Sequence, residues 1–360
     1  MPLATPLPPP RPEVISLGPD RAIIVGELVG RGNFSAVYRG VVEGTYRLRR
    51  PVAVKIFDPL SSEDREQVIA GLARATRHSA CVKHPNVASP EEFVLASSSE
   101  PAIISEWVEG VPLERFVDEH VRLQRRIPTD LALFIALEAA EGLAGARDAF
   151  TPDGVRLNMG HHGLSSREIL LSVHGDVKVT DFGLALALRP ASAVLPLRSF
   201  ARRVTTLPPE IAHGSRGDAR SDVFALGMLL REMLVGPRFS PGTSDANMLD
   251  MVRDGLMDSS ALERHLPEPI SSILARSIEI EPKRRYPHAG LFADDLRRAC
   301  APMGVGDGRV FLRQAIDELF TGEHIECEQP TVDFGRDSGA RLAAGHEHHD
   351  IDEEDWVGEV

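Results

Sequence analysis

The chain has 360 residues, of which 42% are hydrophobic and 26% are charged, a normal composition for a soluble globular protein with a buried core. Cys81, Cys300 and Cys327 lie far apart in the sequence, which argues against a disulfide framework or a cysteine-rich zinc site and indicates a reducing compartment. No stretch approaches the roughly 18 consecutive apolar residues that span a bilayer. The N-terminal residues also lack an apolar signal core, so we expect a cytoplasmic protein with no membrane partner.

Most of the net charge of −13 is carried by the C-terminal end of the chain. Residues 321–360 contain 12 acidic residues against two arginines, a net of −10, whereas the rest of the chain is nearly balanced. The phosphates of a nucleic acid would repel such a tail, so we expect no nucleic-acid partner. We expect residues 321–360 to be disordered and to dock on a protein partner, although a tail that only keeps the protein soluble has the same composition.

The N-terminal part of the chain consists of a short extension followed by a β-rich region. Residues 1–20 contain six prolines in their first 12 positions and are expected to be extended and solvated. β-Branched runs broken by glycine then predict strands around 23–25, 36–38 and 52–54. A helix is predicted over 61–82, because Ser61 or Ser62 can cap it and acidic residues lie in its first turn, and a strand follows over 101–107.

The remainder of the chain turns helical beyond Gly110. Apolar residues at helical spacing predict helices over 131–149, 221–234, 267–278, 289–300 and 310–320. Residues 221–234 are apolar on almost all sides, which predicts a helix buried in the core. The predicted class is therefore α+β with two lobes: a β-rich lobe over 21–108, a helical lobe over 109–305, and a C-terminal helix over 306–320 ahead of the tail.

Three short motifs indicate a function only when they are considered together. Gly30 and Gly32 lie between β-prone flanks, which suits a turn whose backbone approaches phosphates closely, although an ordinary hairpin shows the same pattern. Lys55 closes an apolar strand, and a lysine there is either a gatekeeper at a sheet edge or a placed charge. Asp181-Phe182-Gly183 follows a further strand pattern. Each motif is ambiguous alone, but their order along the chain is informative.

In this order the motifs resemble the protein kinase family, and the resemblance covers about residues 23–298. It implies a two-lobed kinase fold that binds ATP or ADP with Mg²⁺. In that fold a glycine-rich loop and a lysine hold the phosphates, while an apolar slot and a hinge strand hold the adenine. The resemblance therefore implies a nucleotide site formed by Gly30, Gly32, Val37, Ala53, Lys55, Glu106, Val108 and Leu170, with Asp181 and Glu168 as metal ligands.

Further landmarks of the family lie along the rest of the chain. Glu210, in a Pro-Pro-Glu sequence, matches the end of the activation segment, and Arg285 matches the arginine that pairs with it. Asp222 and Gly227 fit the buried central helix. Ser105 matches the gatekeeper position beside the adenine and is small. These matches favour the protein-kinase branch over small-molecule kinases that share the lobe plan.

The segment that should carry catalysis departs from the family pattern. Asp181 lies 13 residues beyond Glu168, the spacing expected between the loop asparagine and the metal aspartate of the family. This register places Gly163 where the family has its catalytic aspartate, Ser165 where it has a lysine, and Glu168 where it has the asparagine. A glycine cannot act as a general base, and this loss typically lowers the rate about 10²- to 10⁴-fold. Glu168 can still ligate a metal through oxygen, but it brings an extra negative charge next to the nucleotide.

The helix predicted over 61–82 adds another departure. The family has a glutamate there that pairs with the strand lysine, and in this sequence the position is Ala75. Glu66, the nearest acidic residue upstream, lies nine residues away, which is about 13.5 Å of helical rise and half a turn out of phase. We therefore expect Lys55 to lack its usual partner.

The sequence as a whole predicts a protein-kinase-like domain that is a pseudokinase, acts as a regulatory or scaffold module in signalling, and binds ATP or ADP weakly. One alternative is an active but atypical serine/threonine protein kinase, and another is a small-molecule phosphotransferase of the same fold. In a further alternative, Lys55 and Asp181 only support the scaffold and bind no ligand.

Overall fold

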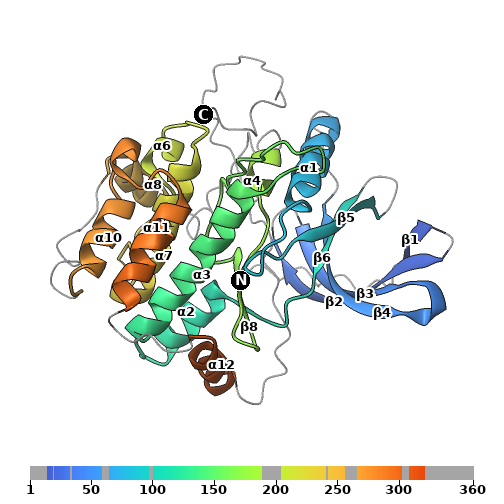
Figure 1. Ribbon diagram of the computed structural model, residues 1–360, viewed down its shortest axis with the longest axis horizontal. Coiled ribbons are helices and arrows are strands. Elements are labelled where there is room, and N and C mark those ends of the chain that lie inside the picture. The colour runs from blue at the N-terminus through green and yellow to red at the C-terminus, as the bar shows by residue number, and fades with distance from the viewer. Residues whose placement is uncertain are drawn as a thin grey trace, which may run out of the picture.

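The computed structural model describes residues 14–18, 20–32, 35–58, 65–96, 100–188, 204–240, 242–255, 266–301 and 308–320. Figure 1 shows a β-rich lobe, drawn in blue on the right, beside a larger helical lobe. This is the two-lobed α+β architecture expected from the sequence. The predictions for residues 321–360 and for the first 13 residues concern parts of the chain outside the described ranges.

The strands are β1 (Val14–Gly18), β2 (Arg21–Arg31), β3 (Ser35–Glu43), β4 (Arg49–Phe57), β5 (Pro90–Leu95), β6 (Pro101–Glu106), β7 (Gly110–Pro112), β8 (Ile169–Ser172) and β9 (Val177–Val179). The α-helices are α1 (Arg65–Ser79), α2 (Leu113–Arg122), α3 (Thr129–Asp148), α4 (Leu184–Ala187), α6 (Pro209–Ala212), α7 (Ala219–Val235), α8 (Asp245–Arg253), α10 (Ile270–Ser277), α11 (Ala289–Cys300) and α12 (Gly308–Leu319). Single 3₁₀ turns occur at η1 (Thr45–Arg47) and η4 (Pro282–Arg284). The five helices predicted beyond Gly110 are all present, with ends that differ by at most three residues. Within the described ranges, no helix has both the length and the hydropathy needed to cross a bilayer.

The N-terminal lobe is built on an antiparallel sheet of six strands in the order β1-β2-β3-β4-β6-β5. The runs predicted to be strands lie in β2, β3, β4 and β6. β1 differs from the prediction, which placed residues 1–20 in a solvated extension. Ile15 of β1 is buried in one cluster with Ile23 and Val25 of β2. Burial of this side chain stabilises the strand although prolines precede it.

α1 packs beside this sheet and spans Arg65–Ser79, so it ends three residues earlier than predicted. The predicted start of the helix, at residues 61–64, lies outside the described ranges. Its buried face includes Ala75. A Cβ atom on Gly71 would lie 3.2 Å from Ala187 of α4, so these two helices are in close contact. α1 therefore packs against α4, the helix that follows the Asp-Phe-Gly motif.

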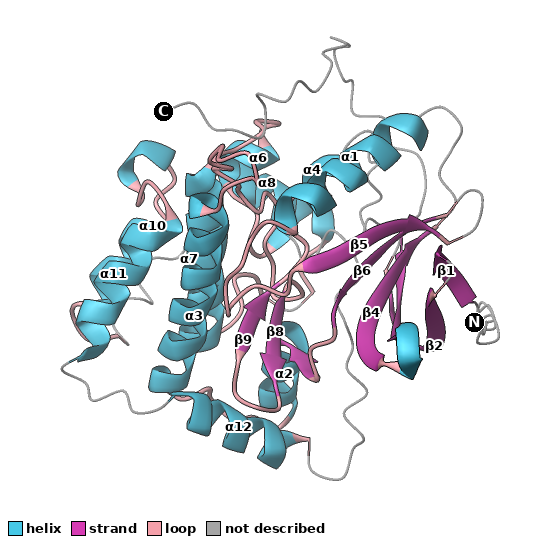
Figure 2. Ribbon diagram, turned by 45° about the vertical axis from the view of Figure 1, so that its right-hand side comes forward, coloured by secondary structure: helices cyan, strands magenta, loops and turns pink. Residues whose placement is uncertain are grey.

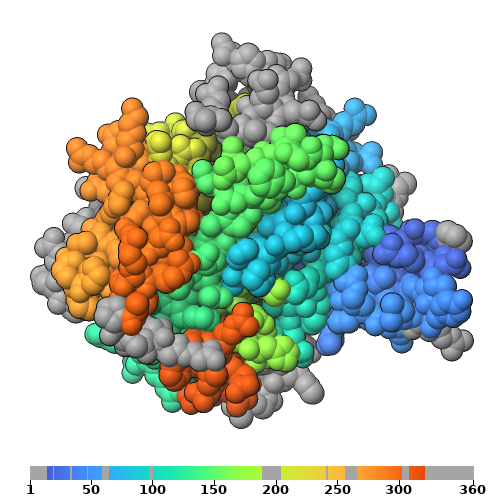
Figure 3. Space-filling view, in the orientation of Figure 1, coloured from blue at the N-terminus to red at the C-terminus, as the bar shows by residue number. Residues whose placement is uncertain are grey.

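A small sheet in the order β7-β8-β9 follows the hinge strand β6, and α12 lies below it in Figure 2. Val179 of β9 bridges to Val87, which ties this sheet to the turn between α1 and β5. At the β8–β9 turn, Arg309 of α12 forms an ion pair with Asp176 at 3.2 Å, and Figure 3 shows the two segments in contact. β7 and β8 were not predicted, because strands of three and four residues are too short to show a period.

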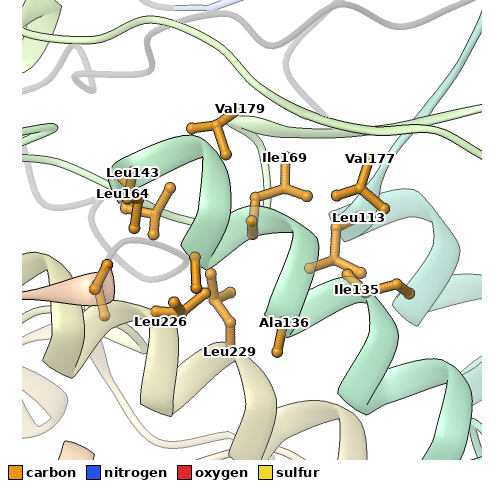
Figure 4. Close-up of a cluster of buried hydrophobic side chains, with 14 of the residues drawn as sticks. Leu113, Ile135, Ala136, Leu143, Leu164, Ile169, Val177, Val179, Leu226 and Leu229 are labelled. Carbon is orange, nitrogen blue, oxygen red and sulfur yellow. The ribbon is translucent and has the colours of Figure 1, made fainter. Parts of the chain in front are cut away.

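The core of the helical lobe lies between α3, α7 and this small sheet. α7 is buried along most of its length, as its uniformly apolar sequence predicted. Figure 4 shows Leu226 and Leu229 of α7 gathered with Leu143 of α3 and with Ile169 and Val177 of the sheet. The loop that connects α3 to β8 is thus anchored at both ends in one apolar core.

Candidate active site

The sheet of the N-terminal lobe brings the predicted nucleotide-binding residues together. Val37 of β3 lies opposite Lys55 of β4 on one side and opposite Gly30 of β2 on the other. Ala53, two residues before the lysine, lies opposite Ser105 of β6. Because side chains alternate along a strand, Ala53 and Lys55 point to the same face of the sheet. Antiparallel pairing therefore assembles residues from four strands into one surface.

The turn between β2 and β3 is closed by a backbone hydrogen bond from the Gly32 N–H to the Ser35 carbonyl, at 2.8 Å. The side chain of Ser35 is fully buried. The glycine-rich turn can therefore offer a ligand its backbone rather than this hydroxyl.

Lys55 lacks the usual partner on α1, as the sequence predicted, but it has another partner. Its ammonium group forms an ion pair and hydrogen bond with the carboxylate of Asp181, and both side chains are less than one-tenth exposed. Asp181 has a left-handed backbone conformation with φ of 66°, which is uncommon for a residue other than glycine. The sequence did not reveal this second partner, because it lies 126 residues away and not on α1.

α1 contributes no acidic group to this pair. Ala75, at the position of the family's glutamate, is fully buried. Ser79, one turn later, donates its hydroxyl to the carbonyls of Ala75 at 2.7 Å and Phe182 at 3.3 Å. The helix is thus joined to the Asp-Phe-Gly motif by a hydroxyl group and by apolar packing instead of by a second ion pair with the lysine.

The start of the catalytic loop keeps its structural supports. The backbone N–H groups of His161 and His162 donate to the two carboxylate oxygens of Asp222, at 2.7 and 2.9 Å. The His161 ring donates from Nε2 to the Thr180 carbonyl at 2.8 Å and lies 5.0 Å from the ring of Phe182. The loop is therefore held in place by both α7 and the Asp-Phe-Gly segment.

The rest of the loop contains a local hydrogen-bond network between Ser165 and Glu168. Gly163 presents no side chain at the position of the family's base. The N–H of Ser165 donates to Oε2 of Glu168 at 2.9 Å, and its hydroxyl donates to the same oxygen. Glu168 is only 1% exposed. The Ser-x-x-Glu spacing is that of a capping box, a signal from which this bond could have been predicted.

The four residues predicted to contact adenine are apolar side chains in the interior of the protein. Val37, Ala53, Val108 and Leu170 are all buried, and the last two pack together against Ala88. These side chains come from β3, β4, the hinge and β8, so they can cover both faces of a planar base.

Glu106, at the end of β6, is held from two directions. Its backbone N–H donates to the Ser89 carbonyl at 3.4 Å. Its carboxylate pairs with the ammonium group of Lys178 on β9, at 2.9 Å. The sequence did not reveal this pair, because 72 residues separate the two partners and neither lies in a recognisable motif.

A magnesium ion fits this arrangement less well than an adenine base does. Mg²⁺ is usually bound by one or two carboxylates together with phosphate oxygens and water. Of the two predicted ligands, Asp181 is paired with Lys55 and Glu168 is bonded to Ser165. Across the described ranges, no group of three or more His, Cys, Asp or Glu side chains could hold a metal ion.

The predicted brace of the helical lobe is confirmed. Arg285 donates to both carboxylate oxygens of Glu210, at 2.7 and 2.8 Å, and its side chain is fully buried. Ser221 of α7 also donates to this carboxylate, at 2.8 Å. Burial alone would raise the pKa of Glu210, but the hydrogen bonds and charge of Arg285 outweigh it and lower the pKa below its usual value.

Comparison with known proteins agrees with this geometry. A family model described as protein tyrosine and serine/threonine kinase matches residues 23–293. One relative is the probable serine/threonine-protein kinase PknB of Lactococcus lactis, which is 29% identical over 74% of this chain and 40% of that protein. Another is the probable serine/threonine-protein kinase PknB of Bifidobacterium longum, which is 30% identical over 76% of this chain and 39% of that protein. The tyrosine-protein kinase MasK of Myxococcus xanthus is 28% identical over 74% of this chain and 41% of that protein. This chain thus spans only about two-fifths of the length of these relatives.

The fold is also found among solved structures. The kinase domain of PknI from Mycobacterium tuberculosis matches with a TM-score of 0.53 and 18% identity, over 77% of this chain and 95% of that one. Because the family match covers most of the described residues and both lobes, the chain belongs to the protein tyrosine and serine/threonine kinase family.

Proposed function

We propose that this chain is a pseudokinase, a regulatory or scaffold module in signalling that binds a protein partner and does not itself transfer phosphate. The observation that carries the proposal is the catalytic loop. Gly163 supplies no base, and the carboxylate of Glu168 is buried as the hydrogen-bond acceptor of Ser165. Both changes fall on groups that contact the reacting atoms in the family, while the supports of the loop are kept.

The chemistry that is lost is substantial. Phosphoryl transfer is catalysed by positioning and by electrostatic stabilisation, with a base or water-positioning group and metal ions in place. Loss of a general base raises the barrier by about 3–5 kcal/mol. Ser165 is neutral at a position where a cation would stabilise charge on the transferring phosphoryl group. These effects need not add, because the groups act as a unit.

The same site supports weak nucleotide binding. Val37, Ala53 and Leu170 keep the apolar slot, but the phosphates of ATP or ADP would compete with Asp181 for Lys55. We expect a dissociation constant near 100 μM, about 5.5 kcal/mol of binding free energy. Calorimetric titration with and without Mg²⁺ measures this constant. No heat at millimolar nucleotide would leave a scaffold that binds none.

The decisive experiment is a phosphotransfer assay with matched variants. The purified wild-type protein is expected neither to autophosphorylate nor to phosphorylate generic substrates above background. Lys55→Met and Asp181→Asn should leave any residual signal unchanged, because that signal would come from traces of host kinase. A clear signal in the wild type that disappears in both variants would establish the alternative, an active atypical kinase.

The proposal also includes a protein partner for the acidic tail and a cytoplasmic location. The acidic residues 321–360, with apolar points at Ile351 and Trp356, suit a segment that docks on a basic protein. We compare pull-downs with the full chain and with a truncation after Phe320. An unchanged set of partners would refute a docking role for the tail. Cell fractionation tests the proposed cytoplasmic location.

A further inference from the structure

A cavity of about 600 Å³ opens beside the hinge strand, and most of the residues that form it have no part in the nucleotide site. Its walls come from the turn between α1 and β5, from Glu106 at the end of β6, and from Lys178 of β9. The bridge between Val87 and Val179 holds the α1–β5 turn against β9. Figure 3 shows the blue-to-cyan α1–β5 segment beside the yellow-green hairpin on the face toward the viewer. The volume lies in the range of small-molecule sites in proteins, about 300–1,000 Å³.

The lining combines apolar and charged residues. Its apolar residues are Ala80 and Pro90, which are partly exposed, and Val82 and Val87, which are buried beneath the surface. Two acidic residues lie in the walls, and both already have a cation. Glu91 forms a bidentate ion pair with Arg50, and Glu106 is paired with Lys178.

Lys83 is the cation of the cavity that remains available. It is exposed, and within the described part of the chain it forms no hydrogen bond or ion pair. His84 provides a second donor in the lining. Its Nδ1 accepts the Asn86 N–H at 3.2 Å, so in the neutral ring the hydrogen is on Nε2. With both acids neutralised, the unpaired charge of the cavity is positive, which favours an anion over a cation.

We propose that this cavity is a binding site for a small organic anion, whose carboxylate or sulfonate lies beside Lys83 and whose apolar body lies against Ala80 and Pro90. The site is connected to the nucleotide site at two points. Glu106 belongs to the strand that leads into the hinge, and Lys178 lies three residues before Asp181. An anion that draws Lys178 away from Glu106 would therefore affect both the hinge strand and the segment that leads to Asp181.

Such a connection makes the two ligands interdependent. If the anion changes the affinity for nucleotide by some factor, the nucleotide changes the affinity for the anion by the same factor. This coupling rests on the proposed binding of ATP or ADP. Binding of the anion itself does not, so the two can fail separately.

The test uses the full chain and anilinonaphthalene sulfonate, a fluorescent aromatic monoanion of suitable size. The wild type is expected to show a saturable component with one probe per chain. Lys83→Ala should weaken this component about tenfold, the cost of one hydrogen bond to a charged group, and Lys83→Glu should weaken it further. Lys83 is exposed, so neither change is expected to disturb folding.

Two further variants separate specific binding from adsorption to the surface. Lys283→Ala removes an exposed lysine of η4 in the other lobe and should leave the titration unchanged. Ala80→Trp fills the cavity and should abolish the saturable component, with a thermal melt to verify that the variant is folded. The proposal is overturned if Lys83→Ala and Lys83→Glu titrate like the wild type, or if Lys283→Ala weakens binding equally. Coupling is refuted if the probe leaves a measurable ADP affinity unchanged.

Discussion

The Glu210–Arg285 brace contains a partly buried carboxylate and the loop from Gly163 to Glu168 contains a buried one, and the two carboxylates have different partners. Glu210 meets a guanidinium in bidentate geometry. Glu168 meets a neutral hydroxyl and a backbone N–H of Ser165. The first arrangement joins residues 75 positions apart, and the second joins residues three positions apart within one loop.

The arginine of the brace also bonds to groups other than Glu210. Besides Glu210, the guanidinium of Arg285 donates to the carbonyls of Glu279 at 2.6 Å, Ile280 at 2.9 Å and Arg220 at 3.2 Å. It also lies 4.6 Å from the ring centre of Phe224. Removal of the arginine thus takes away the charged donor of the Glu210 carboxylate, which keeps the hydroxyl of Ser221 as a side-chain donor, and it also takes away the donor of three carbonyls. The two regions should therefore respond differently to mutation.

The largest effect is expected from Arg285→Leu. Loss of one partner of a buried ion pair costs about 3–5 kcal/mol of unfolding free energy, because the remaining charge is left uncompensated. Urea unfolding followed by circular dichroism measures this change. The control is Arg284→Leu, which removes the neighbouring exposed arginine and should change stability by less than about 0.5 kcal/mol. If both variants lower the unfolding free energy equally, the Glu210–Arg285 pair does not stabilise the helical lobe.

A smaller effect is expected from Glu168→Ala. This change leaves the N–H and hydroxyl of Ser165 without their acceptor, a cost of about 1–3 kcal/mol. The control is Ser166→Ala in the same loop, expected within about 0.5 kcal/mol of the wild type. Calorimetric titration of nucleotide adds a second readout. If Glu168→Ala abolishes the Mg²⁺ dependence of nucleotide binding at unchanged stability, Glu168 is a metal ligand and our interpretation of the loop is wrong.

The smallest effect is the pH dependence of the brace. The pKa of Glu210 is lowered in the folded protein, so its contribution to stability is present above the pKa of the unfolded chain and is lost as pH falls through the folded value. Glu210→Gln cannot titrate. The difference in unfolding free energy between wild type and this variant should therefore shrink below about pH 4. Urea unfolding of both proteins across this range tests it, and a difference that stays constant or grows in acid would contradict the assignment.

Much of the fold could be predicted from local pattern. The helix at 289–300 was predicted with its exact ends, and the buried character of α7 followed from its uniformly apolar sequence. The Glu210–Arg285 pair followed from the family resemblance. The Ser165–Glu168 bond could also have been predicted, since three-residue spacing is local. Local signals suffice here because each interaction is encoded within a few residues or in an ordered set of motifs.

Other features could be decided only by the tertiary structure. The sequence showed that Lys55 had lost its partner on α1, but only the packing of the two lobes brings Asp181 to it. The Glu106–Lys178 pair and the cavity that it lines likewise join segments from both lobes. β1 formed beside a proline-rich stretch because Ile15 is buried against β2. In each case the deciding energy is a contact between residues distant in sequence, or the burial of a side chain on another strand, and no local spacing encodes it.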